Sequence, residues 1–172
     1  MPRPPAIVLD SMVLINMATA RLLEIASGLP EPLVVPPDVV EETVEAGERL
    51  GYADASLIRK AIQEGWIRAT EKVDERVVRR LQRENRLRRA DAAVVALSLK
   101  LRAIAGSDDG KVRRVAELEG AACGGTGYLL GRLVMTGKLT RQEAKDRLDA
   151  MIGGGWYCDV ETYGKLLRQL GL

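Results

Sequence analysis

Acidic side chains follow the short apolar runs of this sequence, at places where the strands of an α/β sheet would end. Asp10 comes directly after AIVL (6–9), and Asp108 and Asp109 come directly after AIAGS (103–107). Ligands of open α/β sheets bind outside the carboxyl ends of the strands. We therefore expect these carboxylates to face one edge of a sheet, where they could carry out chemistry together.

Two further acidic positions belong to helices beside those runs. Glu41 and Glu42 lie in the first turns of the helix expected after LVV (33–35), and Asp91 opens the apolar helix that precedes AIAGS. Carboxylates gathered at one edge repel one another unless a cation neutralises them. Oxygen ligands without His or Cys select hard cations, so the pattern predicts Mg²⁺ or Mn²⁺. Such a cluster would activate water for the in-line hydrolysis of a phosphodiester.

Each acid also has a structural interpretation. Asp10 could cap the helix that follows it, and Asp91 could stabilise a helix N-terminus through the helix dipole. Asp-Asp-Gly at 108–110 is also a turn sequence, and it leaves open which of its two aspartates would act. At the second position, Glu41 stands three residues after Asp38 in a capping arrangement, which favours Glu42 as the functional carboxylate.

Composition removes most other catalytic chemistry. The 172 residues include no His, which excludes Ser-His-Asp and Cys-His catalysis and zinc sites of the HExxH kind. The two cysteines, Cys123 and Cys158, are too few and too far apart for a zinc site, and we expect reduced, buried thiols rather than a disulfide. Phe is absent and aromatic residues make up 3%, which argues against RNA recognition through an aromatic stacking platform.

Positive charge is concentrated in one segment although the net charge is only +2. Residues 76–89 contain seven Arg and one Glu. On a helix, Arg76, Arg79, Arg80 and Arg83 would share one face, and Arg is well suited to bidentate phosphate contacts. This arginine stripe is either a nucleic-acid contact or a solvated helix face.

Strand and helix patterns alternate along the chain, which predicts a three-layer α/β/α sandwich with a mostly parallel central sheet. We expect a single domain over 1–172, with a core over about 6–125 and a helical C-terminal extension over about 126–172. GGTG at 124–127 lacks the Lys and spacing of a phosphate loop and is better interpreted as a turn. The expected strands are 6–9, 33–35, 66–70 and 103–107, and the expected helices are 11–26, 38–46, 53–65, a segment from about 74, 89–103, 111–120, 124–138, 140–152 (opened by a Thr140–Glu143 capping box) and 160–172.

Targeting signals are not recognisable in the sequence. No apolar run approaches the roughly 18 residues needed to span a bilayer. The start, MPRPPAIVLD, has one Arg and a very short apolar stretch, unlike a signal peptide. We therefore expect a cytoplasmic protein that does not bind membranes.

Four segments, taken in order, resemble the motifs of the PIN-domain family. They are VLDSMVLIN, VVPPDVVEETV, ADAAVVALSLKL and AGSDDGKVRRVAE, and they lie within residues 6–120. Farther on, EGWI at 64–67 and GTGYLLGRLVMTGKLT resemble an uncharacterised prokaryotic, often archaeal, PIN subgroup related to VapC toxins.

The resemblance implies a PIN-like fold and magnesium- or manganese-dependent cleavage of RNA. It implies metal ligation by Asp10, Glu42, Asp91 and one of the pair at 108 and 109. Ser-x-Asp spacing favours Asp109, whereas the acidic pair of the subgroup favours Asp108. The family often has Thr-Asn after the first Asp, and Ser11-Met12 stands here, so only Ser11 can assist.

Partners also follow from the resemblance. VapC-like members act on RNA as toxins, pair with a small antitoxin protein and frequently form homodimers. In this interpretation Arg79, Arg80 and Arg83 hold RNA phosphates. The alternative is a non-catalytic nucleic-acid- or protein-binding module on a PIN fold, which would be expected to lack one or more of the acids.

Overall fold

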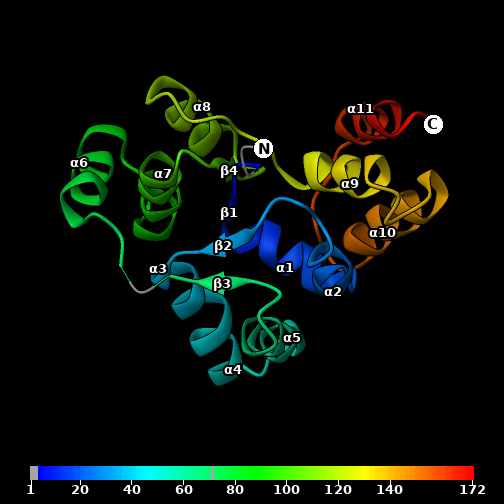
Figure 1. Cartoon of the computed structure of the whole chain (residues 1–172), viewed down its shortest axis with the longest axis horizontal. Coiled ribbons are helices and arrows are strands. Elements are labelled where there is room, and N and C mark those ends of the chain that lie inside the picture. Colours follow the sequence, from blue (N-terminus) through cyan, green and yellow to red (C-terminus); the bar gives the residue numbers. More distant parts are fainter. Residues whose placement is uncertain (1–3, 71) are drawn as a thin grey trace.

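A computed structural model describes residues 4–70 and 72–172 of the protein. Four strands form one parallel sheet in the order β3-β2-β1-β4 (Figure 1). Val8 pairs with Val34 on one side and with Ala105 on the other. The strands are β1 (Ile7–Leu9), β2 (Leu33–Val35), β3 (Arg68–Ala69) and β4 (Ile104–Gly106), which confirms all four expected strands.

Helices cover both faces of the sheet, so the predicted three-layer α/β/α fold is confirmed and the sheet is parallel throughout (Figure 1). One face carries α6 (Glu75–Asn85), α7 (Arg89–Leu101) and α8 (Gly110–Leu118). On the other side lie α1 (Ser11–Thr19), α5 (Ala53–Gln63) and α9 (Thr126–Met135). Farther from the sheet on that side, α10 (Arg141–Gly153) packs on α1 and α9, and α11 (Val160–Leu170) packs on α9 and α10.

Helix α7 is the central packing element of its layer, because it contacts both β1 and β4. Every residue over 90–98 is buried. Four of these nine are Ala, and short side chains allow a helix to pack closely on a sheet. Asp91, on the first turn of this helix, is thereby drawn to the end of the sheet.

The helix expected over 11–26 is in fact two helices. Helix α1 ends at Thr19, and α2 (Leu23–Ala26) begins after a turn in which Arg21 has a φ of 53°. The turn is closed by the backbone N–H of Leu22, which donates to Met17 O at 2.8 Å. The side chain of Leu22 is fully buried. The chain therefore buries its apolar residues by changing direction at this turn, instead of by the continuous helix that was expected.

The helix after β2 is longer than expected and contains an irregular turn. It consists of α3 (Pro37–Val40), a π-helical turn over Glu41–Glu45 and α4 (Ala46–Arg49). The Thr43 hydroxyl donates to Val39 O at 2.7 Å within it. Single π turns inside α-helices occur frequently at functional sites. This turn sets the directions of Glu41 and Glu42.

The C-terminal helices pack on the same core as the strands. Leu129, Leu130 and Leu133 of α9 are fully buried, and both α9 and α10 contact α1. The predicted capping box of Thr140 and Glu143 is confirmed at the start of α10.

Glycines 124 and 125 lie in the connection that enters α9, as expected for a turn. Just before it, Ala105 N donates to Ala122 O at 2.8 Å and Gly124 N donates to Ala105 O at 3.0 Å, which anchors this connection beside β4. Among the helices of the described residues, none is long and apolar enough to cross a membrane.

Candidate metal centre and nucleic-acid interface

Asp10 lies between the ends of β1 and β4. Its backbone N–H donates to Gly106 O at 2.9 Å, and its carboxylate accepts the N–H of Val13 at 2.8 Å. It therefore caps α1, as its structural interpretation predicted. The residue is only 5% exposed, which is costly for a group whose sole role is to cap a helix.

The surroundings of Asp10 disfavour its charge. Burial raises its pKa to about 6, against the lowering effect of hydrogen bonds from Ser107 and the Val13 N–H. The negative charges of Asp108 and Asp91 raise the pKa further. Three carboxylates from β1, α7 and the segment after β4 are thus close enough to repel one another, as the sequence predicted for the sheet edge.

Asp91 is paired with an arginine from the segment before its own helix. Arg88 Nε and Nη2 donate to the two carboxylate oxygens of Asp91 at 2.9 and 3.2 Å. The hydrogen bonds and charge of Asp91 raise the pKa of Arg88, and the charges of Glu42 and Asp109 raise it further. The Arg88 guanidinium therefore stands among three of the predicted acids. Sequence reasoning did not select Arg88, although its place three residues before Asp91 was a usable signal.

Glu42 and Glu41 point to different neighbours. Ser11 Oγ donates to Glu42 Oε2 at 2.6 Å, so Glu42 contacts the residue that follows Asp10. Glu41 instead accepts a bond from Arg49 at 3.3 Å on the surface. The capping arrangement expected for Asp38 and Glu41 does not form, because the N-cap of α3 is Pro36, whose side chain has no hydrogen-bonding group. The preference for Glu42 is thus supported by its hydrogen bond with Ser11, and not by a capping role of Glu41.

The two aspartates after β4 have separate partners. Asp108 accepts bonds from Thr126 N at 2.8 Å and Thr126 Oγ1 at 2.6 Å. Asp109 is exposed and caps α8 by accepting the N–H groups of Lys111 and Val112 at 2.7 and 3.1 Å. The charge of Asp108 raises the pKa of Asp10, whereas the charge of Asp109 raises the pKa of Arg88. Asp108 is therefore the aspartate of this pair that lies nearer the buried Asp10. Thr126 was not expected to take part.

Gly125 leaves the space that Asp108 occupies. A Cβ at position 125 would overlap the Asp108 carboxylate and approach Ser107 O at 2.8 Å. We expect Gly125→Ala to cost about 1–3 kcal/mol of unfolding free energy, as overpacked sites do, and to displace Asp108. Gly131→Ala, inside the helix α9 that Gly125 precedes, is the control, since a Cβ there meets open space. Thermal denaturation tests this, and equal melting temperatures for the two variants would contradict it.

One cavity of about 400 Å³ is lined by the four predicted aspartates and by Arg88, but not by Glu42, and we call it the acidic cavity. Its second wall is formed by the connection between α10 and α11, so the C-terminal helices help to build it. Neither Trp156 nor Tyr157 was a predicted site residue; the only signal was their position after three glycines. The lining residues are Asp10, Ser11, Met12, Arg88, Asp91, Asp108, Asp109, Gly155, Trp156 and Tyr157.

The donor chemistry of the acidic cavity fits a divalent cation. Its four aspartates offer oxygen atoms only, and the mutual repulsion around Asp10 is the kind that a bound cation relieves. Within residues 4–70 and 72–172, no three Asp, Glu or Cys side chains converge closely enough to hold an ion as they stand. Binding would therefore require a rearrangement, in which the pair of the exposed Arg88 side chain with the buried Asp91 would have to open.

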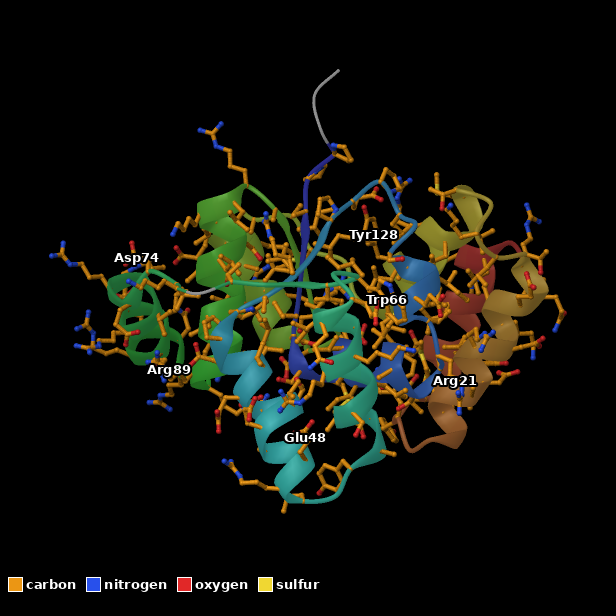
Figure 2. The ribbon with its side chains drawn as sticks, turned by 60° about the horizontal axis from the view of Figure 1, so that its bottom comes forward. Arg21, Glu48, Trp66, Asp74, Arg89 and Tyr128 are labelled. Carbon is orange, nitrogen blue, oxygen red and sulfur yellow. The ribbon has the colours of Figure 1, made fainter. Side chains whose placement is uncertain are left out.

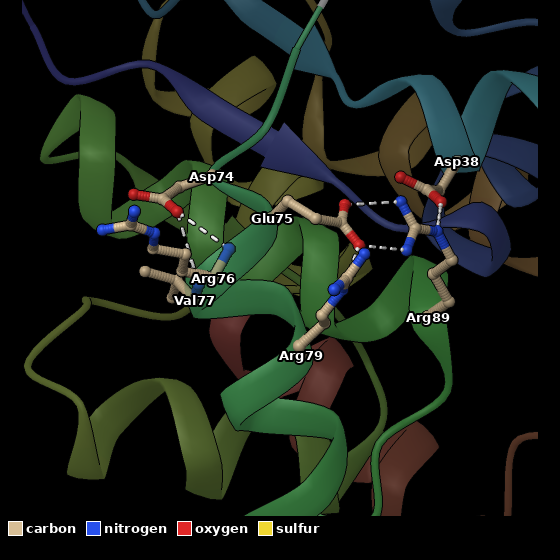
Figure 3. Close-up of polar contacts among 7 residues, drawn as sticks. All are labelled: Asp38, Asp74, Glu75, Arg76, Val77, Arg79 and Arg89. Carbon is tan, nitrogen blue, oxygen red and sulfur yellow. Dashed lines mark hydrogen bonds and ion pairs between the residues drawn. The ribbon is translucent and has the colours of Figure 1, made fainter.

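The arginine stripe is occupied by ion pairs in the structure. Glu75 accepts a bond from Arg79 at 3.1 Å and two from Arg89 at 2.8 and 2.9 Å (Figure 3). Arg80 donates two hydrogen bonds to Glu119, at the C-terminal end of α8, at 2.8 and 2.6 Å. Figure 2 shows Asp74 and Arg89 at the α6 end of the molecule and Tyr128 beside the C-terminal helices.

The outer part of the stripe remains accessible. The side chains of Arg79 and Arg83 are 77% and 78% exposed, whereas that of Arg80 is 38% exposed. Val78 and Leu81 of the same helix are buried, and Val77 is partly buried. Of the three arginines predicted to contact RNA, Arg79 and Arg83 pair with carboxylates of their own helix, whereas Arg80 also pairs with Glu119 at the end of α8.

The two cysteines form no disulfide in the described part of the chain, as predicted. Both are half-buried rather than buried.

Comparison with known proteins identifies the family. A family model described as a PIN domain matches residues 6–172, including the three C-terminal helices. A comparison with curated proteins gave no match. The PIN domain is in general a nuclease fold, whose members hydrolyse nucleic acid with divalent metal ions. With a match over nearly its whole length and the parallel α/β/α fold, this chain belongs to the PIN-domain family.

Proposed function

We propose that this protein is an endoribonuclease that uses Mg²⁺ or Mn²⁺ to hydrolyse RNA phosphodiester bonds. The observation that carries the proposal is that Asp10, Asp91 and Asp108 line one cavity at the carboxyl edge of a PIN-type sheet, near enough for their charges to interact. Carboxylates from three separate elements have no packing reason to share a poorly solvated site, and holding a cation supplies one.

Asp10, Asp91 and Asp108 would hold the metal, with Glu42 and Asp109 at its periphery. A divalent cation in this place supplies water activation and charge neutralisation on the phosphate. Ser11 holds the Glu42 carboxylate through its 2.6 Å hydrogen bond. Thr126 fixes the carboxylate of Asp108 with two hydrogen bonds, so its orientation does not depend on the metal.

Arg88 would have two roles, first as a counter-charge for Asp91 and then as a phosphate ligand. Its side chain is 73% exposed and carries the bidentate geometry that phosphate also accepts. We expect Arg88→Ala to bind Mn²⁺ severalfold more tightly, because a competing cation is removed, and yet to cleave RNA more slowly. Calorimetric titration with Mn²⁺ measures the first effect. Weaker Mn²⁺ binding by the variant would contradict the assigned competition.

The direct test of the activity is cleavage of a mixed RNA pool with Mg²⁺ or Mn²⁺ and with EDTA. Wild-type protein should cleave only with metal, and Asp91→Ala should not cleave. Arg49→Ala is a surface control that lies outside the acidic cavity. Equal activity of wild type and Asp91→Ala would overturn the metal-nuclease assignment.

Arg79 and Arg83 are proposed to contact RNA phosphates outside the acidic cavity. We expect the double variant Arg79→Ala/Arg83→Ala to bind RNA more weakly and to lower the slope of log K against log salt by about 0.7 for each lost contact. Arg80→Ala should instead lower the melting temperature, because Arg80 joins α6 to Glu119. An unchanged salt slope for the double variant would refute the contact.

A second candidate function is a nucleic-acid- or protein-binding module without catalysis. The pair of Arg88 with Asp91 favours it, because it occupies one proposed metal ligand. RNA binding without cleavage under any metal condition would support this alternative. A toxin role, with an antitoxin partner and a homodimer, rests on the family resemblance and belongs to the nuclease proposal.

A further inference from the structure

Half of the aromatic side chains of the protein surround a second cavity beside the acidic one. The chain has two Trp, four Tyr and no Phe. Three of these six, Tyr128, Trp156 and Tyr157, line a cavity of about 720 Å³, which we call the aromatic cavity. Because aromatic residues make up only 3% of the chain, a high aromatic content does not explain why three of them line one cavity.

The aromatic cavity continues from the acidic cavity. Asp108, Trp156 and Tyr157 line both of them. Tyr157 is 84% exposed, and Trp156 is half-buried, packing against the core while it lines both cavities. A polymer whose reacting group lies at Asp108 would therefore extend directly onto these rings.

Positive charge accompanies the rings. Arg113, on the outer face of α8, lines the aromatic cavity and is exposed. The two other cations of its lining are already paired, Arg132 with Glu31 and Lys165 with Glu161 at 2.6 Å. Within the described ranges, Arg113 makes no ion pair to a carboxylate, and it is thus available for an anion.

The size and floor of the aromatic cavity suit a nucleotide. Its volume lies within the roughly 300–1,000 Å³ typical of small-ligand sites. Gly124 forms part of its floor, and a Cβ there would overlap the ring of Tyr128. The glycine thus allows Tyr128 to lie against the connection that enters α9.

We propose that the aromatic cavity holds an unpaired base of the substrate, next to the phosphate that lies at the acidic cavity, with Arg113 on a neighbouring phosphate. This inference rests on the proposed function and assigns to this chain's own residues the place of one base of the substrate. A base inside a duplex is stacked on its neighbours and cannot reach these rings, whereas every unpaired base can stack on an aromatic side chain.

Binding is measured by fluorescence anisotropy with a labelled single-stranded RNA of eight nucleotides and with the same RNA in a duplex. The protein carries Asp10→Asn, so that binding is read without cleavage. Tyr157→Ala and Trp156→Ala should each weaken single-strand binding about five- to a hundredfold, and Trp156→Phe should restore most of it. Duplex binding should be weaker at the outset and insensitive to these changes.

Arg113→Ala and Arg114→Ala are a matched pair, because both side chains are exposed on α8 and only Arg113 lines the aromatic cavity. Arg113→Ala should lower the salt slope by about 0.7, and Arg114→Ala should not. Tyr157→Ala, at a highly exposed position, guards against loss of binding through misfolding. Single-strand affinities unchanged by Tyr157→Ala and Trp156→Ala would overturn the proposal. Loss of a dimer in sedimentation, with RNA affinity intact, would overturn it in favour of a second copy of the chain. The RNA-pool assay decides the nuclease activity independently of both outcomes.

Discussion

Replacing Asp10 with Asn should abolish RNA cleavage and at the same time raise the stability of the metal-free protein. Asn keeps the side-chain oxygen that caps α1 at Val13 N, so the fold should survive. It removes the charge that would hold the metal. Loss of a partner outside the metal's ligand shell costs about 10–100-fold in affinity or activity, and loss of a direct ligand should cost more.

The stability gain follows from the raised pKa of Asp10. Its pKa is about 6 in the folded protein against an ordinary value of 3.8. Between these values the folded state binds more protons than the unfolded state, so the free energy of unfolding falls as pH rises, and it stays low above pH 6. Asn carries no charge and avoids this loss, which is on the order of 2–3 kcal/mol at pH 7–8.

Thermal denaturation in EDTA at pH 5 and pH 8 checks this prediction. The variant should melt higher than wild type at pH 8, and the difference should shrink at pH 5. Asp109→Asn is the matched control, because it replaces an exposed cap and should change the melting temperature little. A lower melting temperature for Asp10→Asn at pH 8 would mean that Asp10 serves the fold rather than the metal.

Replacing Leu129 with Ala should destabilise the whole domain by about 2–5 kcal/mol, the usual cost of a Leu-to-Ala cavity in a core. Leu129 is fully buried in α9, in the same apolar cluster as the strands. For a chain of this size, each kcal/mol lowers the melting temperature by about 2–4 °C. Because α9 contacts α1, α10 and α11, which flank the connections that line the acidic cavity, cleavage should also become sensitive to heat.

Met135→Ala is the control within the same helix, since Met135 is 78% exposed and should contribute less than about 0.5 kcal/mol. Circular dichroism through thermal unfolding should show a single transition for both variants. Two separate transitions for Leu129→Ala, with only the first one shifted, would show that residues 126–172 fold apart from the rest. The C-terminal helices would then be an extension that unfolds independently of the core.

The core strands, Asp10 and Asp91 could be predicted because the local pattern of apolar and charged residues determines their positions. AIVL and AIAGS are short apolar runs that end at charged residues, and burial of the run places the charge at the sheet edge. Asp10 and Asp91 each had a single position that fitted, and the structure brings both to the acidic cavity.

Other features depend on contacts between distant parts of the chain. The turn at Arg21 and the π-helical turn at Glu41–Glu45 interrupt helices whose apolar spacing continues across them, so periodicity could not reveal them. The partner of Glu42 is Ser11, which lies 31 residues away.

The same limit applies to the aromatic residues and the arginine stripe. A content of 3% aromatic residues counted against a stacking surface, but composition carries no information on where three rings gather in space. The face shared by the arginines followed from helical spacing, whereas the Arg80–Glu119 pair required the position of α8.

The central claim, that Asp10, Asp91 and Asp108 hold a divalent cation, is tested most directly by diffraction from crystals soaked in Mn²⁺. An anomalous difference map should show a peak in the acidic cavity between these carboxylates, with Arg88 turned away from Asp91. The Asp10→Asn variant, treated in the same way, should lack the peak. An acidic cavity without anomalous density at saturating Mn²⁺, with the Arg88–Asp91 pair intact, would contradict the account.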